Sequence, residues 1–248
     1  MNADVVRYEA RDEVARVTMN RPEYRNAQNG DITYGLDAAF NTAVDDDSVK
    51  VIVLAGAGEH FSAGHDIASP GRDAHVAHPR KASMWWNHTT HMGADARFAR
   101  EQEVYLGMCR RWREIPKPVI AMVQGACIAG GLMLAWVCDM IVAADDAFFA
   151  DPVVRMGIPG AEYFAHPWVM GPRYAHRPHA GVRSGAARRV TGCRPDQRHR
   201  TLTCTSRSTP RSTRSVTVDR ATLLTAAQLV GLGRRCLDMS VAYARERH

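Results

Sequence analysis

The sequence lacks the residue spacings that mark several common functional classes. Its six cysteines, at positions 109, 127, 138, 193, 204 and 236, include no CxxC pair. This scatter argues against a disulfide framework and favours reduced thiols. GxSxG, Walker A and GxGxxG spacings are also absent, which removes support for serine-hydrolase and nucleotide-binding classes. The first residues lack the basic and apolar regions of a secretory signal, so we expect a cytoplasmic protein.

Lysine is missing from the last third of the chain, where arginine makes the net charge strongly positive. Residues 175–248 contain 15 Arg, no Lys and 4 acidic residues, whereas residues 1–174 contain 17 basic and 22 acidic residues. The net charge of +6 therefore comes from the C-terminal segment. An Arg-rich segment suits nucleic acid or another polyanion. Against that use, Tyr243 is the only aromatic residue after Tyr174 and no binding module is recognisable.

The C-terminal segment also lacks periodicity. Residues 201–217 hold ten Ser or Thr and three Arg, a composition that can scarcely bury a core. We therefore divide the chain into a core, 1–174, and an atypical segment, 175–248, disordered except for one helix near 221–244. A shift of reading frame after Tyr174 would produce such a break, and translating the two other frames of the coding DNA tests this hypothesis.

Formal charge is absent from Pro118 to Cys138, a run long enough to span a bilayer. Glycines and Gln124 interrupt it, Asp139 follows at once, and anchoring residues do not flank both ends. The run is better explained as a buried strand, 119–123, a turn and a short apolar helix, 132–137. We therefore expect no membrane partner.

The rest of the core alternates between strand and helix patterns. Val5–Glu9 and Val14–Met19 predict a hairpin, and Asp31 is positioned to cap the helix that follows. Val51–Leu54 predicts a short buried strand, and Phe98–Trp112 has helical spacing. Repeated β-then-α order predicts an α/β fold with a parallel sheet.

Two glycine-bearing turns follow the two apolar strands. They are Phe61–Asp66 and Gln124–Gly131. The second opens a helix, whose first N–H groups have no partner within the helix and whose dipole favours negative charge. Two such turns side by side would place two N–H donors on one carbonyl oxygen, as in an oxyanion hole. Tight strand–helix packing is the alternative reason for such glycines.

Several motifs occur in an order and spacing typical of one family. They are Asn20-Arg21-Pro22 with Asn26-Ala27, Phe61-Ser62-Ala63-Gly64-His65-Asp66, Pro116-Lys117-Pro118-Val119-Ile120-Ala121 leading to Gly130-Gly131, Cys138-Asp139, and Gly157-Ile158-Pro159-Gly160. Together they resemble the crotonase (enoyl-CoA hydratase/isomerase) superfamily over about residues 5–174. The resemblance implies a crotonase-like spiral of ββα units, with the family's C-terminal helical subdomain absent or altered here.

The resemblance also implies a function in fatty acid metabolism, as a lyase or isomerase acting on an acyl-CoA thioester. Two backbone N–H groups, carried over to Ala63 and Gly130, would hold the thioester oxygen and stabilise an enolate. Coenzyme A would be part of the substrate, with no separate cofactor and no metal. Family members form trimers or hexamers, which the altered C-terminus puts in doubt. Further substrate-binding positions by resemblance are His65, Asp66, Gly131 and Met133; Asp66 is equally suited to fixing its loop.

The two glutamates that hydratases use for proton transfer are missing. Their positions carry Met133 and Val153, which cannot transfer a proton, so activity is altered or lost. Glu162 is the first substitute, as acid or nucleophile, and Asp151 is the second. Each is alternatively a solvated or capping carboxylate.

Other residues with chemical potential carry weaker signals. His75-x-x-His78 and His88-x-x-His91 have ligand-like spacing but no placed Cys or acidic partner, so we favour a loop with scattered histidines over a zinc site. Trp85-Trp86 would line an acyl pocket or pack on the core. Four methionines are expected to fill the core rather than to form a recognition surface: Met84, Met92, Met108 and Met122.

Overall fold

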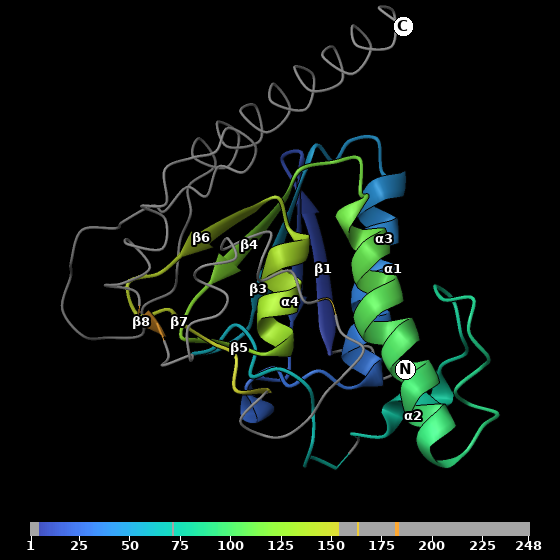
Figure 1. Ribbon diagram of the computed structural model, residues 1–248. Coiled ribbons are helices and arrows are strands. Elements are labelled where there is room, and N and C mark those ends of the chain that lie inside the picture. Colours follow the sequence, from blue (N-terminus) through green and yellow to red (C-terminus); the bar gives the residue numbers. More distant parts are fainter. Residues whose placement is uncertain (1–4, 71, 154–162, 164–181, 184–248) are drawn as a thin grey trace, which may run out of the picture.

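The computed structural model describes residues 5–70, 72–153, 163 and 182–183. Its centre is a five-stranded sheet of order β1-β2-β3-β4-β6, in which β1 and β2 form an antiparallel hairpin and the other neighbours are parallel (Figure 1). The strands are β1 (Val6–Arg11), β2 (Val14–Met19), β3 (Val51–Gly56), β4 (Val119–Val123) and β6 (Met140–Ala143). A second sheet pairs β5 with β7 in parallel and β7 with β8 antiparallel; its strands are β5 (Ala126–Ile128), β7 (Phe148–Ala150) and β8 (Val182–Arg183).

The central strands β3 and β4 are buried along their whole lengths. Their side chains alternate between the two faces, because successive residues of a strand point in opposite directions. Ile52 and Leu54 belong to the main core, whereas Val53 and Ala55 form a smaller cluster with Met122. Burial on both faces explains why these strands are continuous apolar runs in the sequence.

Helices pack together against the main-core face of the sheet (Figure 1). Helix α1 (Gly30–Asp45) contacts β1 and β2, and α4 (Gly130–Val137) contacts β4 and β6. A nearly continuous helix links α2 (Gly93–Glu101), the π-helical turn η3 (Gln102–Met108) and α3 (Cys109–Arg113). It joins α1 through an edge-to-face contact between Phe40 and Trp112, 5.5 Å between ring centroids.

The predicted strands and the apolar helix are confirmed, with β5 as an addition between β4 and α4. The predicted cap of α1 is wrong. Asn29 caps the helix by accepting a hydrogen bond from Ile32 N at 3.0 Å, while Asp31 lies in the first turn and pairs with His78 at 3.1 Å. Both residue types are common at the start of a helix, and the two are only two positions apart in sequence, so residue type alone could not show which of them caps α1.

No described helix is long and apolar enough to cross a membrane. The predicted domain boundary after Tyr174, and the helix near 221–244, lie outside the described residues.

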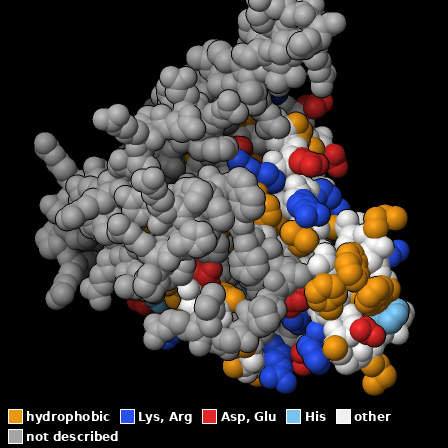
Figure 2. Space-filling model, in the orientation of Figure 1, with side chains coloured by type: hydrophobic (Ala, Val, Ile, Leu, Met, Phe, Trp, Pro, Cys, Tyr) orange, Lys and Arg blue, Asp and Glu red, His pale blue; other side chains and the backbone are white. Residues whose placement is uncertain are grey.

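Exposed aromatic and methionine side chains gather at one end of the molecule, beside α2 (Figure 2, lower right). Met108 and Met122 are buried as expected, but Met84 and Met92 are 97% and 88% exposed, so the expectation that these two fill the core is wrong. Trp85 packs edge-to-face on Trp86 and on Phe98, with ring centroids 4.8 and 5.0 Å apart. The aromatic rings therefore contact one another rather than the main core.

Candidate functional site

The two glycine-bearing turns meet because β3 and β4 are parallel neighbours, so their carboxyl ends emerge at one edge of the sheet. Beyond that edge the segments that follow β3 and β4 remain hydrogen-bonded to each other. Phe61 N donates to Gln124 O at 2.8 Å, Ser62 N to Ala126 O at 3.0 Å, and Ile128 N to Ser62 O at 3.0 Å. Residues 61–65 are thereby held against residues 124–131.

Glycines let the two turns touch backbone to backbone. Gly64 has φ +92°, which favours glycine, and a methyl group there would lie 2.7 Å from Ile128 O. A methyl group on Gly131 would lie 2.6 Å from Ser62 O. Neither carbonyl has room for the extra carbon, so packing accounts for both glycines.

Ala63 is not available as an oxyanion donor, which corrects the sequence prediction for this residue. Its N–H donates to Arg25 O at 2.9 Å, toward the loop before α1 and away from the second turn. The direction of this peptide group depends on pairing with a segment 38 positions earlier, for which the local sequence carries no signal.

The peptide group of His65 is oriented by the hydrogen bonds on either side of it. Gln28 N donates to Gly64 O at 2.7 Å, and Asp66 N donates to Gln28 O at 2.9 Å. His65 lies between these two bonds in a parallel bridge with Gln28, so its own N–H points to the opposite side. A methyl group on Gly64 would lie 3.1 Å from Gly130 N, which puts the amides of residues 65 and 130 on adjacent stretches of backbone.

Helix α4 begins at this contact. Gly130 and Gly131 are its first two residues, and Ala129 O accepts from Leu132 N at 2.8 Å and from Met133 N at 3.2 Å. Ala129 has φ +48°, a rare conformation for a residue with a side chain, and Ala129 N is tied to Ala150 O at 2.9 Å. Such strain persists only where the surroundings fix it, and it clusters at functional sites.

The ring of His65 also lies beside the start of α4. It stacks on Tyr105 of η3, with ring centroids 3.6 Å apart and planes at 11°. Its edge faces Gly130, since a methyl group there would lie 2.7 Å from His65 Cε1 and 2.9 Å from Gln28 Oε1. Sequence reasoning missed Tyr105 because its helical spacing is equally that of a core residue.

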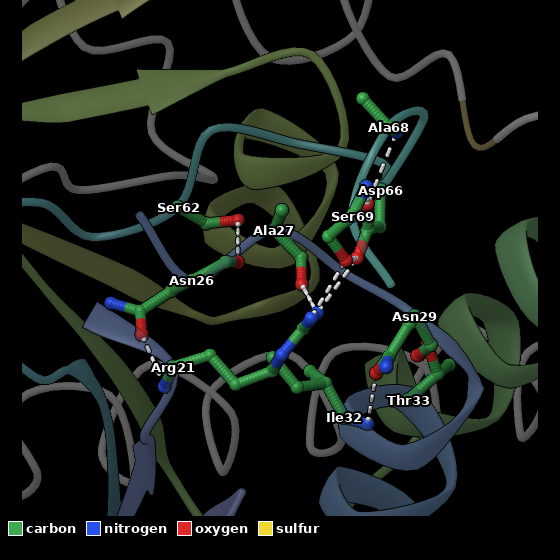
Figure 3. Close-up of polar contacts among 10 residues, drawn as sticks. All are labelled: Arg21, Asn26, Ala27, Asn29, Ile32, Thr33, Ser62, Asp66, Ala68 and Ser69. Carbon is green, nitrogen blue, oxygen red and sulfur yellow. Dashed lines mark hydrogen bonds and ion pairs between the residues drawn. The ribbon is translucent and has the colours of Figure 1, made fainter. Parts of the chain in front are cut away.

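Asp66 is held in a buried ion pair that joins the first turn to the loop before α1 (Figure 3). Its carboxylate accepts from Arg21 Nη1 at 2.9 Å and from Ser69 Oγ and Ser69 N. Arg21 also donates to Ala27 O at 2.9 Å. Burial acts to raise the pKa of Asp66, but the hydrogen bonds from Ser69 and Arg21 outweigh it, and the net pKa lies below its ordinary value. Asp66 therefore fixes this loop.

Asn26, the last polar residue of the first motif, completes this framework. Asn26 Oδ1 accepts from Arg21 N at 2.9 Å, and its Nδ2 donates to Ala57 O and His60 O at 2.9 and 2.8 Å. Ser62 Oγ donates to Asn26 O at 2.9 Å (Figure 3). The side chains of this motif thus hold the first turn in place through hydrogen bonds to backbone groups.

Proton-transferring side chains are sparse around the second turn. Met133 is 3% exposed and Val153 is 9% exposed, and neither titrates. Asp151 Oδ1 accepts from Val153 N at 3.1 Å, the short-range bond of a turn. Burial raises the pKa of the Cys127 thiol well above its ordinary value, so it is a poor nucleophile. Glu162 lies outside the described residues.

The histidine pairs do not assemble a metal site in the described part of the chain. No group of three His, Cys, Asp or Glu side chains there is arranged to hold a metal ion. His78 pairs with Asp31 and stacks on Tyr34, with ring centroids 4.4 Å apart. His91 Nδ1 lies 3.0 Å from Asn87 O.

Alanine at the two adjacent glycines is expected to have different effects. Gly131→Ala should lower the free energy of unfolding by about 1–3 kcal/mol, because the methyl group meets the backbone of Ser62. Gly130→Ala should cost less, because its methyl group meets side-chain atoms of His65 and Gln28 rather than backbone. Urea denaturation of both variants measures the difference, and a larger loss at Gly130 would contradict the packing described here.

An α/β core with two backbone turns apposed at the carboxyl edge of its parallel strands is the arrangement of the crotonase fold, and this chain has that fold. The family model for enoyl-CoA hydratase/isomerase matches residues 14–164. The chain therefore belongs to the enoyl-CoA hydratase/isomerase family, as the motifs predicted.

Individual relatives agree with this assignment. The chain is 44% identical over 181 residues to a putative enoyl-CoA hydratase of Mycobacterium tuberculosis, EchA13; the match covers 68% of this chain and 55% of that protein. It thus spans about half the length of this curated relative. A probable enoyl-CoA hydratase from Mycobacterium smegmatis superposes with a TM-score of 0.64 at 35% identity, over 93% of this chain and 78% of the other. One from Mycobacterium thermoresistibile gives 0.65 at 31% identity, over 97% and 89%.

Proposed function

We propose that this chain binds an acyl-CoA thioester and stabilises the enolate formed from it with the backbone amides of His65 and Gly130. The single observation that supports this is the apposition of the first turn with the start of α4. Fixed N–H donors cost little reorganisation as charge develops, and one such donor typically contributes about 3 kcal/mol to lowering the barrier. His65 thereby replaces Ala63, whose N–H is bonded to Arg25 O.

The proposed reaction is enolate chemistry without the usual hydration. Hydration needs a base for water and an acid for the α-carbon, and the two positions that would supply them hold Met133 and Val153. Removing a proton beside the thioester, and returning it to the same or another carbon, needs only the oxyanion site and one proton-transferring group. We therefore propose an isomerase-type activity in fatty acid metabolism, in the cytoplasm.

The rest of the substrate would extend from the first turn. By family resemblance the CoA moiety would lie near His65 and Asp66, with Gly131 and Met133 beside the acyl group. The buried pair of Asp66 with Arg21 leaves Asp66 a role in shaping this loop rather than in direct contact with CoA. Assembly into trimers or hexamers is part of the same proposal.

A panel of thioesters tests the function. Crotonyl-CoA reports hydration, 3-butenoyl-CoA reports isomerisation, and butanoyl-CoA in D₂O reports exchange of the α-proton by mass spectrometry. We expect exchange and isomerisation to exceed hydration, and calorimetry to detect thioester binding. A chain that binds no thioester and exchanges no proton would contradict the proposal. Glu162→Gln and Asp151→Asn identify whether either carboxylate contributes.

Polyanion binding through the Arg-rich segment is the alternative function. It rests on the excess of 15 Arg over 4 acidic residues in residues 175–248. Binding of duplex DNA at two salt concentrations tests it, because contacts to phosphates weaken steeply with salt. DNA affinity without thioester affinity would favour this alternative.

A further inference from the structure

We propose that a surface patch beside α2 docks on an anionic lipid bilayer, as a peripheral attachment that needs no spanning segment. We call it the aromatic–methionine patch, and it consists of Met84, Trp85, Trp86, Met92 and Phe98. None of these residues belongs to either glycine-bearing turn, so the proposal stands independently of the thioester chemistry proposed above.

Exposed apolar side chains are concentrated in this patch (Figure 2, lower right). Four of the seven exposed large apolar side chains among the described residues belong to it. Met84 and Met92 are exposed almost completely, and Phe98 and Trp86 are 44% and 40% exposed. Scattered single apolar residues are normal on a protein surface, but contiguous ones mark a site of interaction with a partner or a membrane.

The aromatic rings of the patch are held in place before any partner binds. Trp85 contacts both Trp86 and Phe98 edge-to-face. Trp86 Nε1 donates to Asp95 O of α2 at 3.2 Å, and the Arg80 guanidinium donates to Trp85 O. The rings therefore lose little conformational freedom on docking. Exposed tryptophan with a satisfied N–H group suits the boundary between lipid headgroups and acyl chains.

The charges around the patch favour an anionic surface. Residues 80–98 contain three basic side chains, Arg80, Lys81 and Arg97, and one acidic side chain, Asp95. The whole chain has a net charge of +6, with 15 Arg in residues 175–248. Anionic lipids attract such basic groups, and stable attachment generally combines an apolar contact with basic charge. This chain carries both.

Two other occupants fit these observations less well. A second copy of the chain would bring two basic patches together, and like charges oppose association. The acyl chain of a thioester needs a concave site that buries most of its surface. Met84 is 97% exposed and so has almost no protein around it to form such a wall.

The expectation of no membrane partner was drawn from the uncharged run 118–138 alone. That run forms β4, β5 and α4, which belong to the two sheets and the main core. The aromatic–methionine patch lies outside it, and docking on a bilayer surface requires no segment that crosses the bilayer.

The experiment is sedimentation of the full chain with lipid vesicles. We expect binding to phosphatidylcholine vesicles that contain about 30% phosphatidylserine to exceed binding to phosphatidylcholine alone about tenfold. Binding should weaken between about 0.1 M and about 0.5 M NaCl. The double variant Met84→Ser with Met92→Ser, and the variant Trp86→Ser, should each reduce partitioning about tenfold. Brominated lipid should quench tryptophan fluorescence less in Trp86→Ser than in the unaltered chain.

The matched control is Tyr24→Ser. Tyr24 is 39% exposed, close to the value for Trp86, but it lies before α1 and outside the patch, so its loss should leave vesicle binding unchanged. Thermal unfolding checks that every variant is folded; the methionine pair is the safest change, because its side chains are almost fully exposed.

Three results would overturn the proposal. The first is an unaltered chain that does not sediment with anionic vesicles. The second is equal binding by the unaltered chain and by the folded patch variants, which would assign the contact to the Arg-rich segment. The third is self-association or thioester affinity, in place of vesicle binding, that the methionine double variant removes. Thioester binding and exchange are measured without lipid, so failure of the proposed function is distinguishable from failure of this inference.

Discussion

Replacing Arg21 by Met is expected to lower the free energy of unfolding by about 3–5 kcal/mol. The side chains of Arg21 and Asp66 are only 7% and 2% exposed, and their charged atoms lie 2.9 Å apart. Removing the guanidinium leaves a buried carboxylate without its counter-charge, and Ala27 O and Ser69 lose a donor as well. Urea denaturation followed by circular dichroism measures the loss.

The matched control is Arg11→Met, which removes a surface pair with Asp12. Arg11 is 91% exposed and the pair is 3.6 Å long, so we expect a change below about 1 kcal/mol. The double variant Arg21→Met with Asp66→Leu should regain part of the lost stability, because it no longer buries an unpaired charge. Equal losses at Arg21 and Arg11 would show that the buried pair does not stabilise the fold.

The same pair sets a dependence of stability on pH. The pKa of Asp66 is lowered in the folded state, so its contribution is present above the ordinary carboxyl pKa, about 3.9, and is lost as pH falls through the folded value. Stability should therefore decrease below about pH 4 in the unaltered chain. The decrease should be shallower for Arg21→Met, whose carboxylate has lost one of the groups that lower its pKa.

Glu103→Leu is expected to cost about 3 kcal/mol or more. The residue is 0% exposed, and its carboxylate accepts from the backbone N–H groups of Lys81, Ala82 and Ser83. These hydrogen bonds are part-buried, and a donor that loses its acceptor costs up to about 1–3 kcal/mol when it is fully buried. Thermal unfolding measures the total, and hydrogen exchange at residues 81–83 should accelerate because their amides lose the carboxylate.

Two further variants make the Glu103 result specific. Glu103→Gln keeps one carbonyl acceptor in place and should lose less stability than Glu103→Leu. Glu114→Leu removes an exposed carboxylate at the end of the same long helix and should change little. If exchange at residues 81–83 is unaffected by Glu103→Leu, the carboxylate is not what holds this loop.

Elements that are buried on both faces were predictable from sequence. β3, β4 and α4 are short apolar runs bounded by glycine or charge, and burial leaves no other composition available to them. The two turns were also predictable, because glycine is required where backbones touch. The π-helical turn η3 was not, since its residues have the apolar spacing of an ordinary helix.

The direction of individual peptide groups was beyond sequence reasoning. Ala63 and His65 are two positions apart in one motif, and they differ in which strand each N–H faces. That difference is set by pairing with residues 25–28, a contact between segments far apart in the chain. The Arg21–Asp66 pair has the same origin, with 45 positions between its members.

The backbone contact between residues 62–65 and 128–131 has a consequence for how this region tolerates sequence drift. Groups contributed by the main chain survive almost every substitution, and only proline removes an N–H. An alanine scan of these two turns would therefore detect the side chains that hold the turns and the glycines. It would not detect the backbone N–H groups proposed as oxyanion donors, because alanine keeps them. Diverged homologues can lose every recognisable side chain here and still keep the donors.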